Sequence, residues 1–165
     1  MSKAASHRQG LLVYDFEKAA FTYHRTKWGH PAWLNDSNRI LEMGNVVIDV
    51  RDGATARMPG VPVLGGMHPS ANPAATLMVT DGVLTKDVRT TDDEWGVMVA
   101  DIRGGGHVLI DRFRNNRGAA SWRRNHPHPV FSADGKRIYY NVSKDQYTTL
   151  MVAELGAAPA AKAGE

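Results

Sequence analysis

The chain has 165 residues, of which 42% are hydrophobic and 22% are charged, a balance typical of one globular domain. It contains no cysteine, which excludes disulfide bonds, thiolate metal ligands and a cysteine nucleophile. The net charge is +3 and the charges are scattered, whereas nucleic-acid binding requires a longer basic face with interleaved aromatic residues.

No stretch of the sequence approaches the length of about 18 apolar residues that a membrane-spanning helix requires. The first residues lack the apolar core and small-residue cleavage site of a signal peptide. We therefore expect a cytoplasmic protein whose partners include neither a membrane nor a nucleic acid.

Short runs rich in β-branched and aromatic residues follow one another along the chain, separated by glycine, proline, asparagine and aspartate. Such runs predict β-strands, and no segment before residue 150 keeps a helical period over three turns. We expect an all-β domain over 10–155, a flexible N-terminus over 1–9 and a disordered tail over 156–165. In chain order the expected strands are 11–16, 19–25, 39–44, 46–51, 76–82, 96–102, 107–113, 136–142 and 148–155.

A repeated pattern links three of these regions. A His-Pro pair opens a strand, a polar turn follows, and a second strand begins about ten residues after the histidine. The three copies are HPAWLNDSNRILEM from His30, HPSANPAATLMVTD from His68 and HPVFSADGKRIYYN from His128. Their spacings are 38 and 60 residues, and the longer one holds insertions at 82–95 and 113–125.

A four-stranded unit of about 40–45 residues has the size of one β-propeller blade. Residues 10–28 fit the last two strands of a preceding blade, so the chain holds about three four-stranded antiparallel blades. Because a closed propeller needs at least about four blades, we expect a partial propeller. Either the chain is part of a longer propeller, or it is an open array with possible self-association through its open blade edges.

Four segments carry a family resemblance: GHPAW (29–33), GGMHPSANPAATLMVTDG (65–82), WGVMVADI (95–102) and NHPHPVFSADGKRIYYN (125–141). In this order they resemble the C-terminal half of the oligogalacturonate lyases, which are seven-bladed propellers of the TolB-like group. The resemblance implies a β-elimination on short unsaturated galacturonate oligomers from pectin. It also implies one divalent metal ion, typically manganese, bound by histidines.

Carried over by position, the resemblance implies His68, His126 and His128 as metal ligands and His30 as the catalytic base. Two positions differ from the family pattern. Arg123 stands where the family has an amide ligand, and an arginine has no lone pair to offer a metal. Pro31 stands where the family has an acid after the histidine.

The expected chemistry agrees with these residue types. A cation held by neutral imidazoles neutralises the uronate carboxylate beside C5, and a further histidine suits proton removal at neutral pH. In an extended strand His126 and His128 share one face, because they are two residues apart. Further substrate carboxylates are expected to bind a group of arginines, namely Arg112, Arg114, Arg123 and Arg124.

Other interpretations stay open. His30 alone also fits a structural residue at a blade opening, and the arginine group also fits a solvated loop. A non-catalytic TolB-like propeller that serves as a binding or scaffold module would carry the same strands. A propeller domain of a serine peptidase is a third interpretation, and no Gly-x-Ser-x-Gly nucleophile elbow is present in the sequence.

Overall fold

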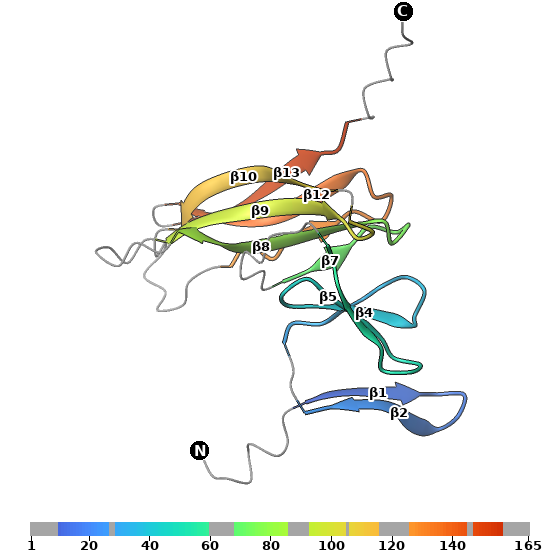
Figure 1. Ribbon diagram of the computed structural model, residues 1–165. Helices are drawn as coiled ribbons and strands as arrows, with labels where there is room; N and C mark the ends of the chain where they lie inside the picture. Colours follow the sequence, from blue (N-terminus) through green and yellow to red (C-terminus); the bar gives the residue numbers. More distant parts are fainter. Residues whose placement is uncertain are drawn as a thin grey trace, which may run out of the picture.

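A computed structural model describes residues 10–26, 29–59, 68–85, 93–104, 106–115, 126–144 and 147–156. Within these ranges the regular elements are β-strands in antiparallel sheets (Figure 1), which confirms the predicted all-β fold. The described ranges contain no helix with the length and hydrophobicity of a membrane span. The N-terminus predicted to be flexible, 1–9, and all but the first residue of the predicted tail lie outside the described residues.

Four sheets follow one another along the chain, and in each of them strands adjacent in sequence are paired. The first sheet holds β1 (Leu11–Asp15) and β2 (Ala20–Arg25). The second holds β3 (Ala32–Trp33), β4 (Arg39–Glu42), β5 (Val46–Asp49) and β6 (Thr55–Arg57). The third holds β7 (Ser70–Ala71), β8 (Leu77–Thr85), β9 (Asp93–Asp101) and β10 (His107–Asn115). The fourth holds β11 (Val130–Phe131), β12 (Arg137–Lys144) and β13 (Tyr147–Glu154).

The sequence repeat appears in the structure as one hydrogen-bonded turn that recurs in three sheets. In each copy the first turn residue donates its N–H to a carbonyl five positions later, and its own carbonyl accepts from the residue three positions later. The first bond joins Leu34 to Arg39 at 2.8 Å, Asn72 to Leu77 at 2.9 Å and Ser132 to Arg137 at 2.8 Å. These turns keep the spacings of the three histidines, so each His-Pro pair opens the first strand of its sheet.

Each pair of successive sheets encloses a hydrophobic core, because side chains along a strand alternate between two faces. On β8, for example, Met78 faces the second sheet and Val79 faces the fourth. The core between the first two sheets contains Val13, Ile40, Ile48 and Val50. The next contains Leu34, Leu41, Met58, Met78, Met98, Ala100 and Ile102. The last contains Val79, Val97, Val99, Phe131, Ile138 and Tyr140.

The two ends of this stack of sheets expose apolar side chains. Leu12 on β1 and Phe21 on β2 are 57% and 66% exposed, and Leu150 and Val152 on β13 are 66% and 53% exposed. In a propeller such faces pack against a neighbouring blade. Self-association through the open blade edges stays a prediction.

Tyr140 connects the third and fourth sheets, because its hydroxyl donates to Asp111 Oδ2 at 2.8 Å. Burial, and then the hydrogen bond to Asp111, raises the pKa of Tyr140 to about 12. An unfolded tyrosine has a pKa of about 10, so the unfolded chain loses this proton first. The free energy of unfolding is therefore expected to fall as the pH rises from about 10 towards 12.

Replacing Tyr140 with phenylalanine is expected to remove this part of the alkaline destabilisation. Urea unfolding followed by circular dichroism at several pH values between 8 and 12 measures it. Tyr139→Phe is the matched control, because the side chain of Tyr139 lies on the opposite face of the same strand. An equal pH slope in wild type and Tyr140→Phe would contradict the expectation.

Candidate metal centre

His68 stands at the opening of the third sheet, two residues before β7. Its ring Nδ1 lies 2.9 Å from Oδ2 of Asp81, and its backbone N–H donates to Oδ1 of the same carboxylate at 3.0 Å. Asp81 lies on β8, the strand paired with β7. The ring of His68 is therefore held by the neighbouring strand of its own sheet.

His126 and His128 lie on the loop that leads into β11. The carbonyl of Pro127 between them accepts the backbone N–H of Asn141 on β12 at 2.8 Å, which fastens the loop to the fourth sheet. The loop is not extended as predicted, because His128 has a φ of +47°, a conformation that costs an L-residue about 1–2 kcal/mol. The strained backbone nevertheless brings both rings to the same region.

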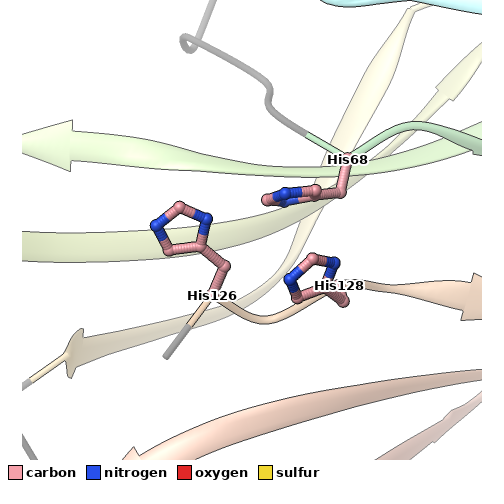
Figure 2. Close-up of side chains that lie close together, drawn as sticks. All are labelled: His68, His126 and His128. Carbon is pink, nitrogen blue, oxygen red and sulfur yellow. The ribbon is translucent and has the colours of Figure 1, made fainter. Parts of the chain in front are cut away.

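The three histidines predicted as ligands converge (Figure 2). One nitrogen from each ring lies within 4.8 Å of the others. The ring centroids of His68 and His128 are 3.7 Å apart, and those of His68 and His126 are 5.1 Å apart. His68 approaches from the third sheet, whereas His126 and His128 come from the fourth (Figure 2).

His30, the predicted base, lies beside this cluster. Its ring centroid is 4.5 Å from that of His68, in an edge-to-face arrangement. The ring is exposed and lines a cleft of about 380 Å³ together with His68, His128, Pro31 and Pro69. The three repeated His-Pro openings thus meet at one cleft, which is the spatial result expected from a propeller repeat.

The surroundings favour neutral rings at two of the ligand positions. Burial, and then the charge of His68, lowers the pKa of both His126 and His128, although the carboxylate of Asp81 opposes the effect. The ring of His126 also packs against the buried indole of Trp95, with 4.9 Å between the centroids. Neutral imidazoles keep the nitrogen lone pairs that a metal needs.

The site fits one divalent transition-metal ion. Two nitrogens bound to one ion at about 2.1 Å each are at most about 4.2 Å apart, so small ring rotations suffice to bring the three histidines onto one metal. A ligating histidine typically donates its second ring N–H to a carboxylate, and His68 has this partner in Asp81. Three imidazoles leave coordination positions open for water or a substrate oxygen.

Asp81 is the functional residue that the sequence analysis missed. Its side chain is 0% exposed, and its carboxylate accepts hydrogen bonds from His68 and from the backbone of His128. A signal was present in the sequence, because Asp81 lies inside the predicted strand 76–82, close to the apolar run 77–79. A charge in such a strand requires a buried partner.

The structure does not bring Arg112 and Arg114 to the histidines. Phe113 packs into the core shared with the fourth sheet, and the two arginines alternate with it on β10, so they point to the other face. Arg112 is also paired with Glu94 at 3.2 Å. The predicted carboxylate-binding role therefore has no support from their positions, and Arg123 and Arg124 lie outside the described residues.

A larger cavity of about 720 Å³ lies between the first and second sheets, away from the histidines. Its two cations are already paired, Lys18 with Asp15 at 3.0 Å and Arg51 with Asp49 at 2.5 Å. The other lining residues are Val13, Tyr14, Thr22, Trp33, Ser37, Asn38 and Val50. None of the predicted site residues that the structure describes lines this cavity.

The strain at His128 yields a prediction about stability. Asparagine tolerates a positive φ better than alanine, so His128→Asn is expected to be more stable than His128→Ala by about 0.5–1 kcal/mol without metal. Both variants are expected to lose the thermal stabilisation that a bound ion gives the wild type. Thermal unfolding with and without an added divalent metal ion measures both effects. Equal stability of the two variants without metal would contradict the assignment of a strained backbone at position 128.

No family model matches the sequence, and no curated protein matches it. Among solved structures, an oligogalacturonate lyase from Vibrio parahaemolyticus is similar, with a TM-score of 0.54 and 15% identity over 77% of this chain. The tricorn protease is similar with a TM-score of 0.52 and 12% identity over 82% of this chain. The chain spans 35% of the lyase chain and 13% of the protease chain. Both are β-propellers, so the predicted propeller fold is confirmed.

Proposed function

We propose that this chain carries the metal centre of an oligogalacturonate lyase-like propeller, which cleaves short unsaturated galacturonate oligomers by β-elimination. The observation that carries the proposal is the convergence of His68, His126 and His128 beside His30. These are the four histidines that the sequence resemblance implies, and they come from three separate sheet openings. The structural likeness to a lyase supports the fold on which the proposal is built.

The roles follow from the chemistry of uronate elimination. A divalent ion, manganese by the resemblance, supplies Lewis acidity that offsets the charge of the carboxylate beside C5. His68, His126 and His128 would hold that ion through ring nitrogens. His30 takes the proton from C5 in the same cleft, the C4–O bond breaks, and a C4–C5 double bond forms while the leaving oxygen takes a proton from water.

Incubation of the purified chain with unsaturated digalacturonate and manganese tests the proposal. The expected result is loss of absorbance near 230 nm and formation of the deoxy-keto uronate, identified by mass spectrometry. His30→Gln is expected to lose turnover with little change in metal affinity, whereas His107→Gln, on the exposed face of β10, is the matched control. Metal-loaded protein without turnover would contradict the lyase proposal.

A metal-binding propeller without catalysis is the second candidate function. It is favoured by the positions of Arg112 and Arg114, which point away from the histidines, and by Pro31 in place of an acid. In that case the same histidines would bind an ion that holds a ligand or stabilises the sheets. Metal binding with substrate retention but no product would select this candidate.

A further inference from the structure

We propose that Asp81 is the positioning residue of this metal centre, which sets the tautomer of His68 and joins the two ligand-bearing segments. The inference rests on the proposal that a metal ion binds at the three histidines. It does not depend on which substrate the protein takes or on whether the protein is a lyase. It is carried by the hydrogen bonds of one buried carboxylate to two histidines, His68 and His128, which are 13 and 47 residues away from it in the sequence.

The carboxylate is saturated by the histidine segments. Oδ1 accepts the backbone N–H of His68 at 3.0 Å, and Oδ2 accepts the backbone N–H of His128 at 3.1 Å. The ring Nδ1 of His68 lies 2.9 Å from Oδ2 and 3.1 Å from Oδ1. One side chain thus fixes the backbone at two ligand positions and the ring at one of them.

Asp81 is buried, and the free-energy cost of burying its carboxylate is offset by hydrogen bonds from the histidine segments. The side chain of Asp81 is 0% exposed, and a buried carboxylate needs hydrogen-bond donors or an opposite charge. Among the described residues no lysine or arginine pairs with it. Its donors belong instead to His68 and His128, which are two of the three candidate ligands.

The carboxylate also decides which nitrogen of His68 is available to a metal. An ionised carboxylate only accepts hydrogen bonds, so Nδ1 must carry the proton. The Nε2 atom then keeps its lone pair, and it is the ring nitrogen left for the ion. Without Asp81 the ring is free to carry its proton on Nε2 instead, which moves the lone pair to Nδ1 and away from the atom that would face the ion.

The bonds also cross between blades. Asp81 belongs to β8 of the third sheet, whereas His128 precedes β11 of the fourth. The N–H of His128 that Asp81 accepts belongs to the residue with a φ of +47°. The same carboxylate therefore stabilises the strained backbone that presents the ring of His128.

Two measurements on the full chain test the inference. Long-range proton–nitrogen NMR of the metal-free wild type is expected to show His68 with its proton on Nδ1. In Asp81→Asn the form protonated on Nε2 is expected to appear, and the Kd for Zn²⁺ or Mn²⁺ is expected to rise by about 10–100-fold. Asp111→Asn is the matched control, because it removes a carboxylate from the neighbouring region that contacts Tyr140 rather than the histidines.

The outcomes separate this inference from the proposed function. His68 protonated on Nε2 in the wild type would overturn the role of Asp81, and this result needs no variant to fold. An unchanged tautomer and an unchanged Kd in Asp81→Asn would overturn it as well. A wild type that binds metal with the expected tautomer but turns over no uronate would remove only the lyase proposal.

Discussion

Replacing His68 with alanine is expected to weaken binding of a divalent transition-metal ion by about 100-fold or more, because it removes one of the three proposed ligands. This loss of affinity is expected to be larger than that of a variant at a residue that does not ligate the ion. Among the described residues, no other side chain takes the place of the His68 ring as a ligand. The rings of His126 and His128 are close to that of His68, with ring centroids 5.1 Å and 3.7 Å away. Its loss therefore leaves two ligands on one loop.

Isothermal titration with Zn²⁺, Co²⁺ and Mn²⁺ measures this loss. The wild type is expected to bind Mn²⁺ more weakly than Zn²⁺, because imidazole sites follow the general affinity order of these metals. Tryptophan fluorescence gives a second readout, since the indole of Trp95 lies 4.9 Å from the ring of His126. His107→Ala is the control, and equal affinities in wild type and His68→Ala would exclude the site.

Ile138→Ala is expected to lower the free energy of unfolding by about 3 kcal/mol, within the usual range for such a core truncation. Ile138 is 0% exposed and lies on β12, where it pairs with Phe131 of β11 and with Ala153 of β13. It contributes to the core between the third and fourth sheets. The truncation leaves a cavity where the packed strands do not collapse freely.

Guanidinium or urea unfolding measures the change, with Val152→Ala as the matched control. Val152 lies on the adjacent strand β13 and is 53% exposed, so its truncation is expected to cost less than about 0.5 kcal/mol. Similar losses for the two variants would contradict the assignment of a core between these sheets. The unfolding is measured at several protein concentrations, because a second copy packed over the exposed face of β13 would make the loss for Val152→Ala depend on concentration, whereas the core assignment would not.

The repeat made much of the fold predictable. The three His-Pro openings have the same turn at the same distance, and the structure shows the same hydrogen bonds in each turn. The fourth residue of the turn has a positive φ in every copy, although only one of the three, Gly135, is a glycine. The propeller class and the meeting of the histidines follow from this periodicity, because blades place equivalent residues around one axis.

Other parts of the site were not predictable from spacing. The role of Asp81 depends on pairing between β7 and β8, and on an approach of the loop before β11 that no local pattern encodes. The face of Arg112 depends on an irregularity in the pairing of β10, where the register shifts between Leu109 and Asp111. Such a bulge reverses which side chains point inward, so alternation read from the sequence does not give the right face.

The three matching openings also show how a sequence repeat becomes a cluster of side chains. A histidine that opens one blade recurs wherever the blade pattern recurs, whatever its role in a single blade. Closing the copies around an axis brings the duplicated rings within reach of one another, as His30, His68 and His128 are here. Three of the four histidines at the cleft therefore occupy the repeated position, whereas Asp81 and His126 have no counterpart of the same residue type in the other copies.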